Sequence, residues 1–359
     1  EDAEKFIAAA QSENLEAYQV AVVTESPRMV MHWKGQKIAD LSREFLNTNG
    51  AVKHATLRVD KKDRTALAQS SVHSLKEMAA SLKSASRRGL TERFDGSIGA
   101  SSVLMPFGGK TQRTPAQAMA ALFPVEPGQE TDQASVMAWG CDPDQLSVDP
   151  YAGAHNSVYT SMAKIVAAGA DYKEAYLTLQ EFFEKLRDEP QRWGKPFSAL
   201  LGALDAQLEL GAAAIGGKDS MSGSFLDKDV PPTLISFAIA PIQGQQVLSP
   251  EFKAADHPVY LFRSEDTKSA WEAFHALCEA GKVKAAWAVE NGLAEAVMKM
   301  SFGNRIGFQA GMEDVDWYAP MVGAIVAELS EDINDPCAVR IGETNEAPFV
   351  ALPGEAVSI

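Results

Sequence analysis

Short apolar runs typical of strands alternate with helical patterns along most of this chain, and that alternation constrains its fold most. It is most regular from about residue 250 onward, where each strand-like run is followed by an amphipathic or polar segment. The sequence therefore predicts an α/β or α+β protein in which sheets pack on helices. The expected elements are helices at 152–168, 197–210, 267–280 and 292–301, and strands at 176–179, 212–215, 234–242, 259–263, 283–289, 305–309, 322–329 and 338–341.

The run Leu234 to Ile242 is almost wholly apolar, which predicts a strand buried on both faces. Residues 65–88 carry apolar side chains at helical spacing and predict one long helix. The first 60 residues predict a helix over 2–14, a strand over 17–24 and a hairpin made by 28–33 and 37–41. These few elements would make a poor independent domain, so we expect this part to be the tail of a domain whose first half is missing.

Composition and charge exclude several classes of protein. The 359 residues predict two or three domains, and a formal net charge of −15 argues against nucleic-acid binding. The three cysteines form no C-x-x-C pair, which argues against a zinc site or a disulfide framework and fits a reducing cytosol. No apolar run approaches 18 residues, and the acidic N-terminus does not resemble a signal peptide. We therefore expect a cytoplasmic protein with neither a membrane nor a nucleic acid as its partner.

One stretch, Leu210 to Phe225, carries the candidate ligand chemistry. It predicts a strand over 212–215 that breaks at Gly216-Gly217 and presents Lys218, Asp219 and Ser220. Two glycines permit positive φ, so backbone N–H groups can turn toward a ligand. A lysine ammonium and hydroxyl groups suit phosphate, and a carboxylate suits Mg²⁺. The spacing is not that of a Walker A loop, and both interpretations stay open: a polar hairpin turn or a phosphate site.

Other catalytic patterns are absent from the sequence. Six histidines are scattered without metal-ligand spacing, and there is no G-x-S-x-G, G-x-G-x-x-G or H-E-x-x-H motif. Cys141 lacks the glycine-rich elbow of a nucleophile, so we interpret it as an ordinary small residue. The acidic run from Cys141 to Pro150 could bind a divalent cation, but a solvated connection is the better interpretation because Asp-Pro pairs commonly start turns.

Several longer runs resemble the large, single-chain form of phosphoribosylformylglycinamidine synthase. Their order along the chain matches that family, and the resemblance covers essentially all of the sequence. The runs are Glu25 to Met31, Asp40 to Gly50, Gly89 to Asp95, Leu104 to Lys110, Thr114 to Gln117, Arg192 to Phe197 and Gly216 to Ser222.

The resemblance implies a domain plan similar to aminoimidazole ribonucleotide synthetase, in which an N-type domain is followed by a C-type α/β sandwich domain. On that plan residues 1–60 are the C-terminal part of a preceding C-type domain, 61–248 the second N-type domain of the ATP-binding superfamily, and 249–359 the second C-type domain. The first N-type domain and the glutaminase would be missing, which agrees with the absence of a Cys-His-Glu glutaminase constellation. The implied partners are the remaining synthetase half and the glutaminase domain of the same full-length chain.

The resemblance also implies the chemistry. ATP activates the amide oxygen of formylglycinamide ribonucleotide, ammonia from glutamine displaces phosphate, and Mg²⁺ assists. Where related small forms carry Gly-Asn-Val-Ser, this chain has Gly217 to Ser220. The implied nucleotide and substrate contacts are therefore the backbone at Gly216 and Gly217, with Lys218 and Ser220, and Asp219 is the candidate metal ligand. Thr178 and Gln180 match positions where small forms place Asp and Asn. Catalytic residues are expected in the missing half.

The chain departs from the family at a second, non-reacting nucleotide pocket. Other large forms build it from a helix Glu-x-x-x-Asn and an Asp-x-Ser-Asp-Gly-Gly turn, whereas here the helix positions are Thr160 and Lys164 and the turn runs from Trp287 to Gly292. We expect this pocket to be degenerate, empty or filled by something less charged. Two alternatives to a catalytic half remain: a non-catalytic scaffold, or a free-standing relative active as a homodimer.

Overall fold

The computed structural model describes residues 2–48, 50–51, 53–94, 96–97 and 100–359. Asn49 and Asp95, which belong to two of the runs quoted above, lie outside the described residues. The chain divides into two compact units, residues 1–55 and 56–359, and each is described by itself.

The first unit contains one antiparallel hairpin between two short helices. Lys34 and Gly35 make its tight turn with φ of 47° and 78°, which is the left-handed geometry that two-residue hairpin turns require. The predicted hairpin is confirmed. The predicted strand over 17–24 is wrong, because a valine-rich run becomes a strand only where a neighbouring strand pairs with it. The elements are α1 (Ala3–Ser12), β1 (Arg28–Trp33), β2 (Gln36–Ser42) and α2 (Arg43–Thr48).

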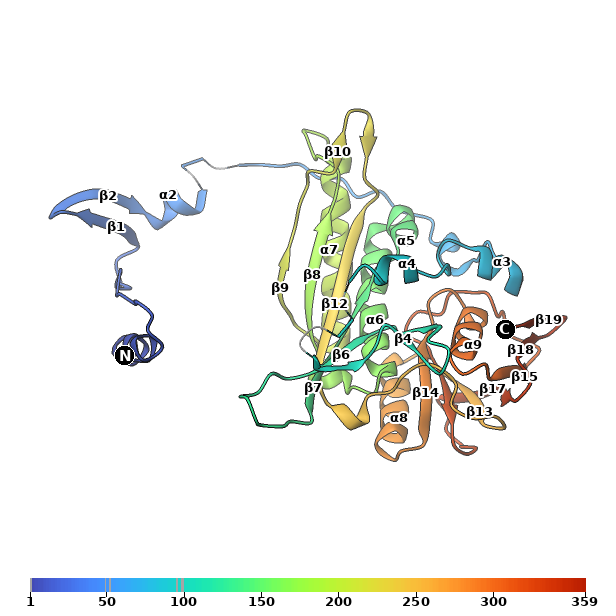
Figure 1. Ribbon diagram of the computed structural model, residues 1–359. Coiled ribbons are helices and arrows are strands. Elements are labelled where there is room, and N and C mark those ends of the chain that lie inside the picture. Colours follow the sequence, from blue (N-terminus) through green and yellow to red (C-terminus); the bar gives the residue numbers. More distant parts are fainter. Residues whose placement is uncertain (1, 49, 52, 95, 98–99) are drawn as a thin grey trace. The chain divides into compact units, whose positions relative to one another are not determined.

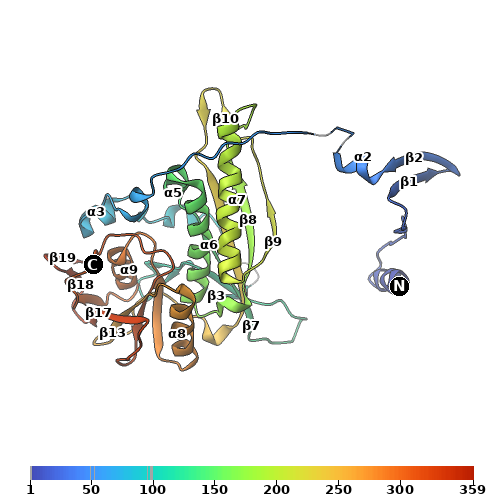
Figure 2. The same ribbon diagram turned by 180° about the vertical axis from the view of Figure 1, so that it is seen from behind.

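The second unit begins with a six-stranded sheet in the order β3-β6-β7-β12-β8-β9. All neighbouring strands are antiparallel except β8 and β9. Helices α6 and α7 lie side by side across one face of this sheet (Figures 1 and 2). The strands are β3 (Ser102–Leu104), β6 (Met119–Leu122), β7 (Gln133–Gly140), β8 (Tyr176–Phe182), β9 (Ala214–Lys218) and β12 (Thr233–Gln243), and the helices are α5 (Pro143–Val148), α6 (Pro150–Ala167) and α7 (Pro190–Leu210). Short pieces accompany them: β4 (Phe107–Gly108), β5 (Thr114–Pro115), β10 (Ser224–Phe225) and β11 (Lys228–Asp229).

Among the described residues, α6 and α7 leave the opposite face of the six-stranded sheet partly exposed. Along β12 buried residues alternate with partly exposed ones, and Ile239 is 37% exposed. Trp139 on β7 and Tyr176 on β8 are 40% and 53% exposed. The prediction that Leu234 to Ile242 is buried on both faces is therefore wrong: its apolar side chains on one face stay partly exposed. We call this surface the open sheet face.

A seven-stranded sheet follows, in the order β14-β16-β13-β17-β15-β18-β19. Every residue of β13 and β16 is buried. Tyr260 and Phe262 pack in one cluster with α6 and α8, while Val259 and Leu261 pack in another with α9, so helices cover both faces. The elements are β13 (Pro258–Phe262), α8 (Thr267–Glu279), β14 (Val283–Ala288), α9 (Leu293–Phe302), β15 (Gly307–Ala310), β16 (Ile325–Leu329), β17 (Ala338–Asn345), β18 (Phe349–Leu352) and β19 (Glu355–Ser358).

Two predictions about connecting segments are corrected. The single helix expected over 65–88 is instead a 3₁₀ turn (Thr65–Ala68) and two short helices, α3 (Leu75–Ala80) and α4 (Arg88–Thr91). Serines interrupt this segment: the Ser74 hydroxyl caps α3 by accepting from the Glu77 N–H, and such side-chain bonds compete with helix continuation. The acidic connection contains helix α5, which Asp142 caps and a proline begins.

None of the helices in the described ranges combines the length and the apolar character that crossing a membrane requires.

Candidate functional site

The predicted glycine turn is an edge strand. β9 continues through Gly216 and Gly217 to Lys218 and pairs in parallel with β8. Neither glycine has a positive φ, so the expected anion-binding bend at these two residues is wrong. The physical reason is that glycine is equally compatible with an extended strand, and the ladder with β8 supplies hydrogen-bond partners for the backbone.

The same ladder gathers most of the predicted site residues. Thr178 is the register partner of Gly216, and Gln180 that of Lys218. A Cβ added at Gly216 would meet only the Thr178 Cγ2 at 4.0 Å, which confirms that the two positions share a face. Because residues two apart on a strand lie on the same face, these positions share the open sheet face with Tyr176. Lys218 is exposed there.

Asp219 and Ser220 follow directly after β9. The Ser220 N–H donates to the Glu181 carbonyl at 3.1 Å, and the hydroxyls of Ser220 and Ser222 share a hydrogen bond of 2.7 Å. Burial, and then the negative charge of Asp219, raise the pKa of the Glu181 carboxyl to about 7. Within the described ranges no three His, Cys, Asp or Glu side chains group as a metal site. Magnesium at Asp219 would therefore need further oxygen ligands, such as water and nucleotide phosphate.

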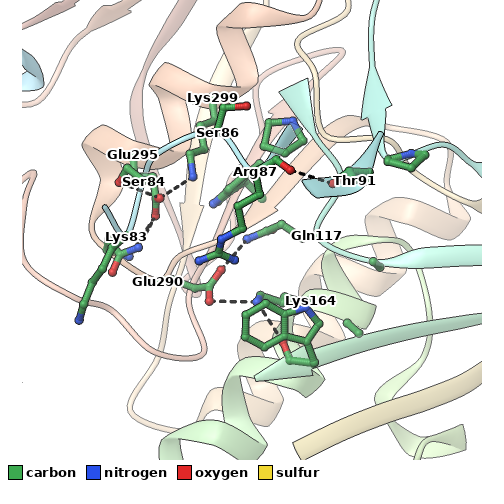
Figure 3. A pocket seen from close by; sticks show the side chains of 18 of the residues that line it. Lys83, Ser84, Ser86, Arg87, Thr91, Gln117, Lys164, Glu290, Glu295 and Lys299 are labelled. Carbon is green, nitrogen blue, oxygen red and sulfur yellow. Dashed lines mark hydrogen bonds and ion pairs between the residues drawn. The ribbon is translucent and has the colours of Figure 1, made fainter. Parts of the chain in front are cut away.

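A separate cavity of about 1380 Å³ lies within residues 79–359. Its walls come from the segment around α4, from β6 and β7, from α6, from the loop after β14 and from α9 (Figure 3). Thr160, Lys164, Trp287, Glu290 and Asn291 all line it. The structure thus brings together, in one cavity, the helix and turn positions at which the sequence departs from the family pattern.

Two of the lining residues, Lys164 and Glu290, form an ion pair. The Lys164 ammonium lies 2.9 Å from a Glu290 carboxylate oxygen, and the lysine side chain is only 4% exposed. The ammonium also donates to the Trp139 carbonyl at 3.0 Å and lies 4.5 Å from the centroid of that ring. Lys164 therefore has both a carboxylate and a carbonyl to compensate its lost hydration.

The other two carboxylates that line the cavity are paired with lysines as well. Lys299 lies 2.7 Å from Glu295, which also accepts a hydrogen bond from the Ser84 hydroxyl at 3.0 Å. Lys83 lies 2.9 Å from Asp142. The ammonium beside each carboxylate already neutralises its charge, which weakens the attraction of these side chains for a divalent cation.

Gln117 joins the two sheets beside the ion pair. Its amide nitrogen donates to the Ala288 carbonyl at 2.9 Å and to Glu290 at 3.2 Å, while its carbonyl accepts from the Ala288 N–H at 2.7 Å. These bonds fix the end of β14 and orient the Glu290 carboxylate.

Cys141 also lines the cavity. Burial, and then the charge of Asp142, raise the pKa of its thiol to about 11. The group is a neutral thiol at physiological pH, which fits the interpretation of Cys141 as a non-nucleophilic residue.

Comparison with known proteins identifies the relatives of this chain, although no protein-family model matches it. The chain is 22% identical over 380 residues to the phosphoribosylformylglycinamidine synthase subunit PurL of Thermoplasma acidophilum, and 22% identical over 389 residues to that of Thermoplasma volcanium. These matches cover 98% and 96% of the chain. The chain is distantly similar to PurL. It spans about half the length of these curated relatives, 48% and 50% respectively.

The solved structures of PurL share the fold. Thermotoga maritima PurL complexed with ATP superimposes with a TM-score of 0.62 at 15% identity, covering 96% of this chain and 53% of that one. The same protein complexed with AMPPCP gives 0.63 at 16% identity. The predicted mixed α/β fold, similar to aminoimidazole ribonucleotide synthetase, is confirmed.

Proposed function

We propose that this chain is the second half of the synthetase region of a phosphoribosylformylglycinamidine synthase of the large, single-chain form. With the remaining half and a glutaminase domain, it takes part in the ATP- and glutamine-dependent conversion of formylglycinamide ribonucleotide to formylglycinamidine ribonucleotide. The observation that carries the proposal is the match to PurL along nearly the whole chain. In this proposal the domain boundaries remain 1–60, 61–248 and 249–359, and the enzyme is cytoplasmic.

The open sheet face supports a role for this half in a shared site. It exposes apolar side chains on several strands of the six-stranded sheet, and exposed apolar patches of this kind mark interaction surfaces. Thr178, Gln180, Gly216 and Lys218 lie on the same face. A missing half that docks there would meet an ammonium and polar groups suited to a phosphorylated ligand, with Ser220 close to the end of the strand.

The nucleotide is ATP in this proposal, because PurL structures with ATP, AMPPCP and ADP share the fold. Lys218 would neutralise phosphate charge and Ser220 would donate a hydrogen bond to phosphate oxygen. Asp219, directly after this strand, is the one side chain that we propose for Mg²⁺.

Reconstitution tests the proposal. The chain is mixed with the missing half and the glutaminase, and product formation is measured with glutamine or ammonium ions as the nitrogen source. We expect activity that requires this chain, and loss of most of it in the double variant Lys218→Ala/Ser220→Ala. Lys228→Ala, an exposed lysine on the neighbouring hairpin, is the matched control and should retain activity. A well-formed complex without activity would contradict a catalytic half.

A second candidate function is a non-catalytic scaffold that supports the synthetase and glutaminase domains. The lysine-paired carboxylates of the cavity favour it, because they argue against an intact Mg-nucleotide pocket in this half. A scaffold predicts that the double variant at Lys218 and Ser220 keeps full activity in the reconstituted enzyme.

A further inference from the structure

Helix α7 buries its small residues and exposes its large ones. Its buried positions are mostly Gly, Ala and Ser, and a Cβ added at Gly202 would lie 2.0 Å from the Tyr151 carbonyl oxygen, so the backbones of α7 and α6 lie very close together. A surface helix normally shows the opposite arrangement, with polar side chains toward the solvent. Every exposed position of α7 from 197 to 208 instead carries a large apolar side chain, between 39% and 72% exposed: Phe197, Leu200, Leu201, Leu204 and Leu208.

These five side chains form one stripe, which we call the α7 stripe. Positions 197, 201, 204 and 208 follow one another at intervals of four, three and four residues, which places their side chains in a line along one face of a helix, with Leu200 beside them. The helix lies on the covered side of the six-stranded sheet and faces the viewer in Figure 2, so the α7 stripe is separate from the open sheet face. An exposed apolar patch of this kind marks a contact surface.

The spacing of the α7 stripe is the same when it is read from either end of the helix. A second copy of α7 laid antiparallel across the stripe would therefore place Phe197 opposite Leu208 and Leu201 opposite Leu204, and the same pairs would form in the reverse direction. Such a contact is self-complementary, which is what a dimer with two-fold symmetry requires. Intervals of four and three residues are also those at which the side chains of two helices interdigitate.

Charge favours the same arrangement. Each chain has a formal net charge of −15, so two copies repel one another unless they meet at an uncharged surface. The α7 stripe is such a surface, and the acidic residues Asp205 and Glu209 lie beside its C-terminal end. Antiparallel helices keep these acidic ends apart, whereas parallel helices would bring like charges together.

We propose that the α7 stripe is the interface of a symmetric dimer of this chain, in which the two α7 helices pack antiparallel. The stripe is only about 16 Å long from residue 197 to residue 208, so the dimer is a weak one, with a dissociation constant in the roughly micromolar range. The dimer leaves the open sheet face free for another partner. It does not depend on the ligase function proposed above, and its tests need only this chain, so their failure is distinct from failure of the reconstituted ligase.

Sedimentation velocity of the intact chain over about 1–100 µM tests the dimer. We expect a dimer whose fraction rises with protein concentration and with salt, because salt screens the repulsion between two acidic chains. Leu204→Glu should weaken it about tenfold or more, since the new carboxylate would be buried against the second copy without a partner. Leu208→Gln, at the most exposed position of the stripe, is a milder change that leaves the fold intact and should also weaken the dimer. The control Leu82→Glu changes an exposed leucine outside the stripe and should leave the dimer unchanged.

Disulfide cross-linking tests the orientation of the helices. A mixture of Phe197→Cys and Leu208→Cys chains should form a cross-linked dimer under mild oxidation, because antiparallel packing places these two positions opposite each other. Neither variant should cross-link to itself, since two copies of one position would lie about 16 Å apart along the helix axis and a disulfide needs Cα atoms within about 7 Å. The unaltered chain, with its three native cysteines, gives the background.

Three results would overturn the proposal. The first is a chain that stays monomeric over the whole concentration range. The second is a dimer that persists in both Leu204→Glu and Leu208→Gln but is lost in Ile239→Glu, which would place the contact on the open sheet face. The third is cross-linking of either cysteine variant to itself above the background, which would exclude the antiparallel arrangement.

Discussion

Removing either partner of the Lys164–Glu290 ion pair should destabilise the protein, but by different amounts. Two unit charges 2.9 Å apart attract by about 6 kcal/mol at an effective dielectric constant of about 20, and desolvation offsets much of this. Glu290→Leu leaves the Lys164 ammonium, 4% exposed, with only a carbonyl and a ring as partners. We expect that change to lower the free energy of unfolding by about 3–5 kcal/mol.

Lys164→Met should cost less. The Glu290 side chain is 28% exposed and keeps its hydrogen bond from Gln117, so water and the amide compensate its charge. We expect a loss of about 1–2 kcal/mol. The double variant Lys164→Met/Glu290→Leu should be more stable than Glu290→Leu alone, because it leaves no buried charge without a partner.

Urea denaturation followed by circular dichroism measures these differences, and a double-mutant cycle isolates the coupling. Lys282→Met is the control, since its ion pair with Glu331 is exposed and should contribute less than about 1 kcal/mol. If Lys164→Met destabilises the protein as much as Glu290→Leu, or if the two losses simply add, the burial argument is wrong.

Three further predictions follow from single positions. Gly217→Ala should lower the free energy of unfolding by about 1–3 kcal/mol, because the new Cβ would lie 2.6 Å from the Leu179 carbonyl oxygen. Gly216→Ala is the control and should change stability little in the same thermal melt. Equal effects of the two variants would contradict the pairing of β9 with β8. The pKa of Glu181 is about 7 in the folded protein against 4.5 in the unfolded chain, so its contribution to stability should be lost as pH rises from 4.5 through 7, by about 1–2 kcal/mol after allowing for solvent screening. Glu181→Gln should flatten this dependence of the free energy of unfolding on pH. An unchanged pH profile would refute the raised pKa. With a thiol pKa of about 11, Cys141 in the folded chain should react with iodoacetamide at neutral pH far more slowly than Cys141 in the unfolded chain. Mass spectrometry measures the two rates. Rapid alkylation of Cys141 in the native chain would show that the thiol is ionised.

Elements with strong periodicity and clear ends were predictable from the sequence. Helix α6 begins at Pro150 after a capping Asp149 and is followed by Gly169 with φ of 104°, all of which are local signals. The regular alternation after residue 250 likewise predicts strands β13, β14 and β16 and helices α8 and α9, with boundaries that differ by only a few residues.

Features that depend on distant neighbours were not predictable. Gly216 and Gly217 have the composition of a turn, and only pairing with β8 makes them a strand. An apolar strand can face helices on both sides or an uncovered surface on one, and Leu234 to Ile242 alone does not distinguish these cases. The cavity is formed by segments far apart in the chain, such as the one around Arg87 and the one around Glu290, which are about two hundred residues apart. Lys164 and the turn that contains Glu290 could be singled out from the sequence, but the contact between Lys164 and Glu290 could not.

The location of Trp139 has a kinetic consequence. Met137, Trp139 and Phe237 belong both to the wall of the cavity and to the open sheet face. Any chain that docks on that face would therefore also shield the cavity from bulk water. A molecule held in the cavity would then exchange with solvent more slowly in such a complex than in this chain alone.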